Sequence, residues 1–305
     1  MRGYKMTKQD IAQTITDGII KQLEAGTAPW VKPWHSKPNE GAPHNPASGT
    51  YYRGANFIWL SMLQSSGVFG ASDKWMTYKQ AQDKGAQVIK GAKGVQVIFY
   101  KPLQVQGALN PTTGTHDSKI IPMIKTYTVF NADFIEGLPV DEVIEAPKTE
   151  FQTIEECEDF IKLSGATIQH GGNSAHYAPA SDYIQLPNRE DFKSKQDYYA
   201  TALHELSHWT GHKSRIDRDF SKSKRWGDSA YAFEELVAEL GAAMLCAHLK
   251  IDGQLQHASY IASWLKVLKQ DSKAILKAGA EAQKILDYLV KVDEVQEEAE
   301  DLKAA

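Results

Sequence analysis

The stretch YYATALHELSHWTGH, residues 198–212, indicates a metal-binding helix in the second half of this chain. His204 and His208 are four residues apart, so on a helix they lie one above the other and can both reach one metal ion. Glu205 follows the first histidine and can take a proton from a metal-bound water, which makes it the candidate general base. Apolar residues occupy the opposite face, and Gly211 marks the expected end of the helix.

A tetrahedral site of this kind needs a third protein ligand. His212 is nearest in sequence, but Gly211 is expected to break the helix before it. Ser214 stands where metalloproteases with the HExxHxxGxxH pattern carry a third histidine, so the chain departs from that pattern. The remaining candidates are carboxylates on an apolar-periodic helix expected from Tyr231 to Leu249, namely Glu234, Glu235 and Glu239.

Glu235 and Glu239 lie four residues apart and share a helix face. One of them can bind the metal while the other accepts the free ring N–H of a ligating histidine. The spacing is similar to that of the gluzincin metallopeptidases, which carry a ligand and then an acid on the helix after HExxH. This resemblance favours Glu235 as the ligand and Glu239 as the supporting acceptor, with Glu234 as the competing ligand. Zn²⁺ is the expected cofactor, and Mn²⁺ also fits two histidines and a carboxylate.

The composition is that of an ordinary globular protein. The 305 residues are 42% hydrophobic and 24% charged, and this length favours two domains. The chain has 2 cysteines, Cys157 and Cys246, which excludes a disulfide framework and a cysteine-ligated zinc site. The first residues lack the apolar core of a signal peptide, and no run approaches the roughly 18 apolar residues of a membrane span. We therefore expect a cytoplasmic protein without a membrane partner, and Met6 offers an alternative start.

Charge divides the chain in two. Residues 1–135 hold 15 Lys and Arg against 8 Asp and Glu, a balance of +7, whereas residues 136–305 hold 19 against 30, a balance of −11. Residues 136–150, EGLPVDEVIEAPKTE, contain two prolines and many acids and are typical of a linker. The sequence thus predicts one domain over residues 1–135 and another over residues 151–305. The basic first domain suggests a polyanionic partner.

The first half has the pattern of a small α+β unit. Isoleucines and a leucine recur every four residues between Thr7 and Ala25, which predicts an amphipathic helix, and a second helix is expected over Phe57 to Gln64. The run from Val88 to Tyr100 predicts a hairpin around a Gly/Lys turn. Residues 107–120 are polar and predict a long connection, after which Lys125 to Phe130 would form a return strand.

Aromatic residues and cations alternate along this first half, a mix that binds single-stranded nucleic acid. Bases stack on aromatic rings for about 1–3 kcal/mol each, and cations follow the phosphates. Lys90 and Lys93 flank glycine at one turn, which suits a phosphate. Because aromatic residues more often belong to a core, the alternative is that these rings are buried. The candidate contacts to single-stranded DNA are Trp30, Lys32, Trp34, Tyr52, Arg53, Asn56, Trp75, Lys79, Lys90 and Lys93.

Segments of both halves together resemble the ArdC antirestriction proteins of conjugative plasmids and the related plasmid primases of the TraC type. They are PWVKPW, YYRGANFIWL, WMTYKQA, VIKGAKGVQVIFY, VFNADFIEGLP, HYAPASDYIQLP, YYATALHELSHWTGHKSRIDR and YAFEELVAELGAAML. The resemblance implies a single-stranded-DNA-binding domain followed by a mostly helical zincin-like metallopeptidase domain with a small sheet. It also implies a role in protecting incoming plasmid DNA from host restriction, which rests on this resemblance alone.

The resemblance also suggests roles for residues in the middle of the second domain. Residues 182–187 fit an edge strand to which an extended peptide substrate could pair, and His176 or Tyr177 just before it could polarise a carbonyl. Arg215 and Arg218 are expected in exposed salt bridges.

Three functions stay open on this basis. The first is antirestriction with metal-assisted peptide hydrolysis, for which a host restriction enzyme is a candidate protein partner. The second is a DNA-associated metalloprotease, unrelated to restriction, that cleaves other DNA-bound proteins. The third is a non-catalytic DNA-coating protein with a structural metal. Structural zinc sites usually fill all four positions with protein ligands, which argues against the third.

Overall fold

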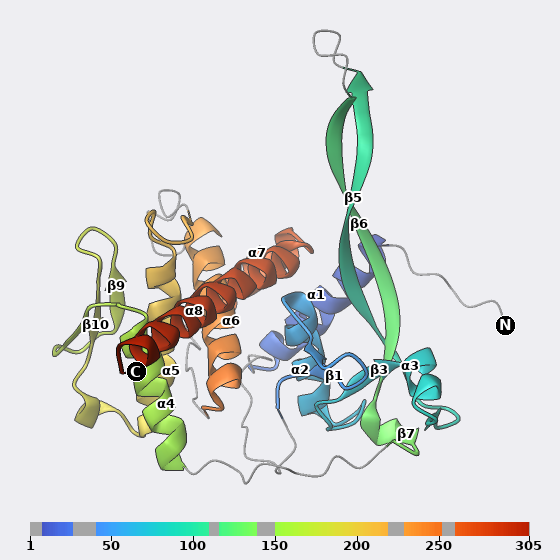
Figure 1. Ribbon diagram of the computed structural model, residues 1–305, viewed down its shortest axis with the longest axis horizontal. Coiled ribbons are helices and arrows are strands. Elements are labelled where there is room, and N and C mark those ends of the chain that lie inside the picture. The colour runs from blue at the N-terminus through green and yellow to red at the C-terminus, as the bar shows by residue number, and fades with distance from the viewer. Residues whose placement is uncertain are drawn as a thin grey trace.

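The computed structural model describes residues 8–26, 41–109, 116–138, 150–218, 229–251 and 260–304. Figure 1 shows two groups of elements side by side, and a long two-stranded arm stands out from the first group. The elements of the first group are α1 (Lys8–Glu24), β1 (His44–Asn45), β2 (Thr50–Tyr51), α2 (Ala55–Ser66), β3 (Trp75–Thr77), α3 (Tyr78–Asp83), β4 (Gln87–Val88), β5 (Val95–Leu109), β6 (His116–Asn131), the 3-10 helix η1 (Ala132–Phe134) and β7 (Ile135–Glu136).

The second group is mostly helical, as the sequence predicts. Its elements are α4 (Glu150–Leu163), β8 (Ile168–His170), β9 (His176–Ala178), β10 (Tyr183–Leu186), the 3-10 helix η2 (Arg189–Asp191), α5 (Lys195–Thr210), α6 (Ser229–Leu249), α7 (Ile261–Gln270) and α8 (Ala274–Ala304). Residues 139–149, most of the expected linker, lie outside the described residues. The proposed domain boundaries therefore stay a prediction.

The arm corrects the expected hairpin at residues 88–100. β5 pairs antiparallel with β6 over a register that runs from Val95 opposite Val129 to Leu109 opposite His116. β4 pairs instead with β7, with Val88 opposite Ile135. The strands also extend into the expected loop at residues 107–120. The local Gly/Lys turn was visible in the sequence, but the partners of β4 and β5 come from distant residues, which local patterns do not reveal.

The small sheet of the second group has the strand order β8-β10-β9. β10 runs parallel to β8 and antiparallel to β9. The segment that was expected to form an edge strand is therefore the central strand, and β9 lies at the edge beside it. The strand pattern was correct, but a run of four residues carries no signal for its position in a sheet.

The two groups share a continuous hydrophobic core. α1 packs on α7, and its periodic residues Ile11, Ile15, Ile19 and Leu23 are all buried. α2 packs on α8 at a close approach where a Cβ atom on Gly279 would lie 2.8 Å from the backbone nitrogen of Ala55. The joint therefore requires glycine at this position. No helix in the described part of the chain is long and apolar enough to cross a membrane.

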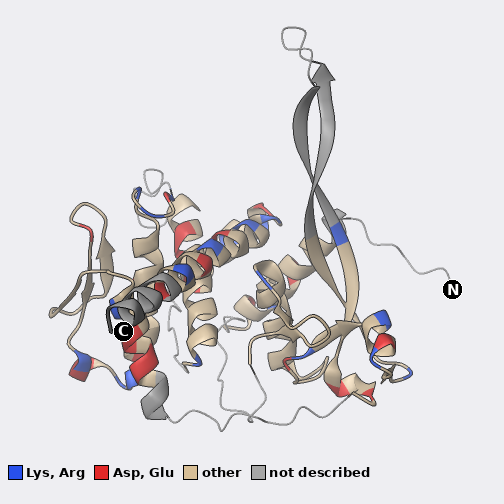
Figure 2. Cartoon of the chain, viewed as in Figure 1, with Lys and Arg blue, Asp and Glu red and all other residues tan. Residues whose placement is uncertain are grey.

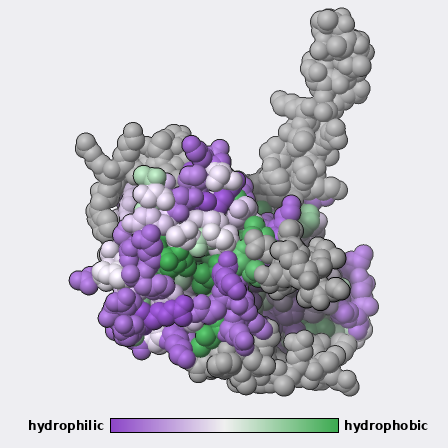
Figure 3. All heavy atoms as spheres, turned by 60° about the vertical axis from the view of Figure 1, so that its left-hand side comes forward, coloured by the Kyte–Doolittle hydropathy of each residue, from purple (hydrophilic) through white to green (hydrophobic). Residues whose placement is uncertain are grey.

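Charged and hydrophilic residues are spread over the described parts of the molecule that the figures present. Figure 2 shows charged residues of both signs along α8. Where residues are coloured in Figure 3, most are hydrophilic, and hydrophobic residues gather near the middle of this face.

Candidate metal centre

α5 presents His204 and His208 on a buried face. The helix begins after Ser194, whose hydroxyl accepts a hydrogen bond at 3.1 Å from a backbone N–H in the first turn. The two imidazole rings meet edge to face with their centroids 4.9 Å apart. Their side chains are 3% and 12% exposed, so both rings point into the protein.

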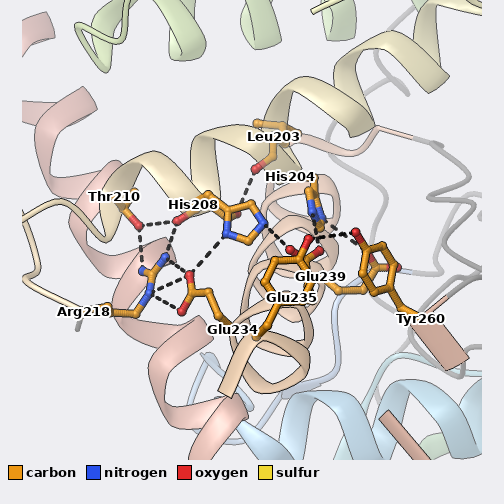
Figure 4. Close-up of polar contacts among 11 residues, drawn as sticks. Leu203, His204, His208, Thr210, Arg218, Glu234, Glu235, Glu239 and Tyr260 are labelled. Atoms are coloured by element: carbon orange, nitrogen blue, oxygen red, sulfur yellow. Dashed lines mark hydrogen bonds and ion pairs between the residues drawn. The ribbon is translucent and has the colours of Figure 1, made fainter. Parts of the chain in front are cut away.

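α6 places the carboxylate of Glu235 against both imidazoles (Figure 4). Its oxygens lie 3.7 Å from Nε2 of His204 and 3.5 Å from Nε2 of His208. One donor atom from each of the three side chains lies within 4.8 Å of the other two, a spacing that could hold a metal ion. Two imidazoles and a carboxylate are ligands that Zn²⁺ and Mn²⁺ both accept. The residues therefore fit a divalent metal, and their role as ligands stays a prediction.

Two further carboxylates approach the other nitrogen of each ring. Glu239 lies 3.3 Å from Nδ1 of His204, and Glu234 lies 3.3 Å from Nδ1 of His208. An ionised carboxylate only accepts hydrogen bonds, so each Nδ1 keeps its proton, and Nε2 is the nitrogen that can give its proton up to a metal. Glu234, the competing ligand in the sequence, thus lies where it can orient His208.

Arg218 holds Glu234 in this position. Its Nη2 donates to Glu234 at 2.9 Å and to the carbonyl oxygen of Ser207 at 2.6 Å, and its Nη1 donates to Oγ1 of Thr210 at 2.9 Å. The side chain is 7% exposed. The exposed salt bridge expected for Arg218 is therefore wrong, because the guanidinium lies buried between α5 and α6 (Figure 4).

The cluster carries an excess of negative charge. Burial by itself would lower the pKa of His204 and of His208, but hydrogen bonds to the carboxylates outweigh it and raise these pKa values to about 10 and about 9. Burial works to raise the pKa of Glu235, yet the two histidines hold it below its ordinary range. The buried or half-buried carboxylates of the cluster are Glu205, Glu234, Glu235 and Glu239. Such a set favours the binding of a cation.

Two tyrosines lie at this site whose role there was not predicted from the sequence. Tyr231 lies one helical turn before Glu235 on α6, and Tyr260 caps the start of α7; their hydroxyl oxygens are 3.1 Å apart. Burial, and then hydrogen bonds to Tyr260 and Glu235, raise the pKa of Tyr231, so its hydroxyl stays a donor at neutral pH. The spacing to Glu235 could have revealed Tyr231, but nothing in the sequence connects Tyr260 to this helix. Glu205, the candidate base, is 7% exposed.

Other candidates near the motif have structural partners. His212 contacts Oγ of Ser214 through Nδ1 at 2.8 Å and is not part of the convergent group. Arg215 donates to both carboxylate oxygens of Asp182, and its guanidinium lies 3.7 Å from the ring centroid of Trp209. Its side chain is also 7% exposed, so the expected exposed salt bridge is wrong here too. Because Asp182 lies in the turn between β9 and β10, Arg215 ties this hairpin to α5.

The candidates for DNA contact in the first half occupy different environments. Trp75 is 0% exposed and lies in the core, so it offers no ring face to a base, which corrects that expectation. Trp75 begins the short strand β3, whose first two residues are both buried. The hydroxyl of Tyr52 donates to the carbonyl oxygen of Trp75 at 3.0 Å, and burial raises the pKa of Tyr52 to about 12. The alternative, that the aromatic ring is buried in the core, is therefore correct for Trp75.

The polar candidates for DNA contact also divide, into residues with structural partners and residues that are exposed. Asn56 binds the backbone of Ile98, and Arg53 forms an ion pair with Asp287 on α8. Both side chains therefore have a structural use. Three lysines, Lys79, Lys90 and Lys93, are exposed. The candidates Trp30, Lys32 and Trp34 lie outside the described residues.

Two protein families match this chain, one in each half. Residues 9–130 match the family described as the N-terminal domain of anti-restriction factor ArdC, and residues 155–281 match the zincin-like metallopeptidase family. Two Escherichia coli proteins named DNA primase TraC are 42% and 40% identical over 95% of this chain, which spans 20% and 28% of their length. The uncharacterised protein y4eC of Sinorhizobium fredii is 38% identical over 93% of this chain and 92% of its own.

Two crystal structures of the antirestriction ArdC protein from the R388 plasmid are similar along nearly the whole chain. The metal-free structure has a TM-score of 0.76 and 40% identity, and covers 93% of this chain and 98% of that chain. The Mn(II)-bound structure has a TM-score of 0.73 and 39% identity, with the same coverage. The two matched regions, their order and this similarity agree, and the chain therefore belongs to the ArdC family, with a zincin-like domain after its N-terminal domain.

Proposed function

We propose that this protein protects incoming plasmid DNA from restriction, that its first half binds single-stranded DNA, and that its second half hydrolyses a peptide bond. The observation that supports the hydrolytic part best is the convergence of His204, His208 and Glu235 within 4.8 Å, beside the buried Glu205. The similarity to the antirestriction ArdC protein supports the biological role. The target of hydrolysis would be a protein bound to the same DNA, such as a host restriction enzyme.

His204, His208 and Glu235 would hold the metal. Zn²⁺ is the expected ion for a zincin-like domain, and the Mn(II)-bound relative makes Mn²⁺ an equal candidate. When bound, such an ion polarises a carbonyl group and acidifies a water molecule. Glu239 and Glu234 keep the two imidazoles in the orientation that ligation needs.

The remaining steps fall to this chain's own residues. Glu205 would accept the proton of the attacking water, since it directly follows His204 on the buried face of α5. The hydroxyls of Tyr231 and Tyr260 would donate hydrogen bonds to the carbonyl oxygen as negative charge develops on it. Arg215 would keep the β9–β10 hairpin, against which a peptide would lie, in register with α5.

The DNA-binding part rests on charge and on the family match of residues 9–130. The balance of +7 over residues 1–135 favours a polyanion, and Lys79, Lys90 and Lys93 are exposed to meet one.

Plasmid transfer into a restricting recipient tests the proposal. Conjugation efficiency would be measured with the wild-type protein, with Glu205→Ala, and with Glu190→Ala as a control at an exposed glutamate away from the site. We expect wild type and Glu190→Ala to raise transfer into the restricting strain, and Glu205→Ala to lose that gain. Transfer into a strain without restriction should be equal for all three.

The outcomes separate the parts of the proposal. Full protection by Glu205→Ala would overturn hydrolysis as the mechanism and favour DNA coating. No protection by the wild type would overturn the antirestriction role. Mass spectrometry of recipient proteins would then show whether Glu205-dependent cleavage takes place independently of restriction.

A further inference from the structure

Exposed apolar side chains gather in the first half of the chain. The large hydrophobic side chains exposed among the described residues are Tyr51, Val68, Tyr78, Ile89, Phe99 and Tyr127, and the described part of the second half has none. Leaving an aromatic ring in water forgoes about 2 kcal/mol of burial free energy, so neighbouring exposed rings indicate a surface for a partner. Trp75, one of the rings that the sequence suggested, is buried and is not on this surface.

Phe99 and Tyr127 form such a pair at the base of the arm. Their ring centroids are 6.0 Å apart in an edge-to-face arrangement, and the residues are 55% and 44% exposed. Alternation along the strands puts them on the same face as Val97 and Val129, which are buried in the core. The face therefore runs continuously from the core into solvent, and the aromatic pair is its first exposed part.

Asn56 fixes the strand that carries this pair. Its side-chain amide donates to the carbonyl oxygen of Ile98 at 2.6 Å, and its side-chain oxygen accepts from the N–H of Ile98 at 2.8 Å. The bonds hold β5 against α2 next to Phe99. They also occupy the backbone N–H and C=O of Ile98, so another strand cannot pair with β5 at this residue. Beside Phe99, a partner is therefore expected on the face of the strands.

The charge beside the pair favours a polyanion. Lys125 lies opposite Phe99 in the register and is exposed, and Lys93 is exposed just before β5. The described base of the arm, residues 95–99 and 125–131, contains no aspartate or glutamate. Exposed rings with a flanking cation and no acid match the base faces and phosphates of a single strand.

We propose that Phe99 and Tyr127 form a base-stacking platform for single-stranded DNA and that Lys125 binds a phosphate beside it. The platform deepens the DNA-binding part of the proposed function and rests on it. Because Asn56 holds the backbone of β5 next to Phe99 and the two rings already contact each other, little order is lost on binding, which favours affinity.

Binding of the full chain to a fluorescein-labelled oligothymidylate, followed by anisotropy over a salt series, tests the platform. The double variant Phe99→Ala/Tyr127→Ala should weaken binding by about tenfold or more, because two stacking contacts are lost. The ring-swap variant Phe99→Tyr/Tyr127→Phe keeps both rings and should bind like the wild type. Tyr51→Ala removes an exposed ring outside the pair and should also bind like the wild type. Lys125→Gln should reduce the slope of log affinity against log salt by about one.

The outcomes are distinct. If the wild type does not bind the oligonucleotide, the DNA-binding part of the proposed function fails. If the wild type binds and the double alanine variant binds equally well, the platform is overturned while DNA binding stands. Equal loss in Tyr51→Ala would also overturn it. Sedimentation velocity tests whether a second copy of the chain occupies this surface instead. A wild-type dimer that becomes monomeric in the double variant would overturn the assignment to DNA.

Discussion

Glu239 on α6 lies 3.3 Å from Nδ1 of His204 on α5, with both side chains almost fully buried at 1% and 3% exposure. The carboxylate therefore orients the imidazole from the side opposite to Glu235. A supporting acceptor of this kind keeps the ligand nitrogen aimed at the metal and raises its basicity.

Glu239→Gln should weaken binding of Mn²⁺ and of Zn²⁺ by about 10-fold to 100-fold, because the amide keeps the volume but loses the charge. Competition with a chromophoric chelator measures the affinities. Glu281→Gln, on α8, where Glu281 forms an ion pair with Lys284, is the matched control and should leave both affinities unchanged. Unchanged affinity in Glu239→Gln would show that the contact with His204 has no part in metal binding.

Arg218 gives a prediction about stability. Arg218→Met would leave the carboxylate of Glu234 buried without its main partner, so the free energy of unfolding should fall by about 3–5 kcal/mol. The exposed pair of Arg53 and Asp287, with side chains 61% and 46% exposed, provides the comparison. Arg53→Met should cost less than about 1 kcal/mol. Urea unfolding of both variants is the measurement, and equal losses would contradict the buried role of Arg218.

The contrast between these arginines shows what the sequence could predict. The helix that carries His204 and His208, and the helix α1, follow from local periodicity, because residues that share a helix face repeat every three to four positions. The burial of Arg218 depends on how the chain after α5 folds back over α6. No local pattern encodes that path, so the default for an arginine, an exposed ion pair, was wrong.

The first half shows the same limit for strands. The sequence correctly predicts extended backbone around Val88 and Val95, yet the partners of these residues, Ile135 and Val129, lie far along the chain. The alternation of aromatic residues and cations makes Trp75 a candidate for base stacking, with core packing as the alternative, since tryptophan occurs both in cores and at interfaces. Its buried position in β3 decides between the two, and that position is a property of the tertiary structure.

Gly241 lies where α6 approaches α5 closely, and the metal site depends on this approach. A Cβ atom there would lie 2.8 Å from Cδ1 of Ile285 and 3.0 Å from Oγ of Ser207. Gly241→Ala should therefore lower the free energy of unfolding by about 1–3 kcal/mol through overpacking, and should weaken metal binding as α6 moves away from α5. The second change Ile285→Val removes the Cδ1 atom and should restore part of both losses. Thermal unfolding and the chelator assay measure them, and a Gly241→Ala protein as stable as the wild type would refute the close approach.

The lowered pKa of Asp182, in the hairpin beside the site, makes the free energy of unfolding depend on pH. The hydrogen bonds from Arg215 hold the pKa of Asp182 at about 2, with a smaller lowering from Tyr177. The unfolded chain has an aspartate pKa of about 3.9, so the folded state binds fewer protons between these values. The stabilisation is therefore complete above about pH 4 and is lost as the pH falls toward 2. A shift of this size corresponds to about 2.5 kcal/mol before screening, and because the side chain is 39% exposed we expect roughly 1 kcal/mol.

Asp182→Asn tests this linkage without changing the backbone, since asparagine tolerates the positive φ of 52° at this position. At neutral pH the variant should be less stable than the wild type by roughly 1 kcal/mol in urea unfolding, and the gap should shrink near pH 3, where the aspartate of the unfolded wild-type chain is mostly protonated while that of the folded protein is not. Asp191→Asn, at an exposed aspartate of η2, serves as the control and should show no gap at either pH. A gap for Asp182→Asn that stays constant with pH would mean that Arg215 holds the β9–β10 hairpin by shape and by its stacking on Trp209, rather than by the charge of Asp182.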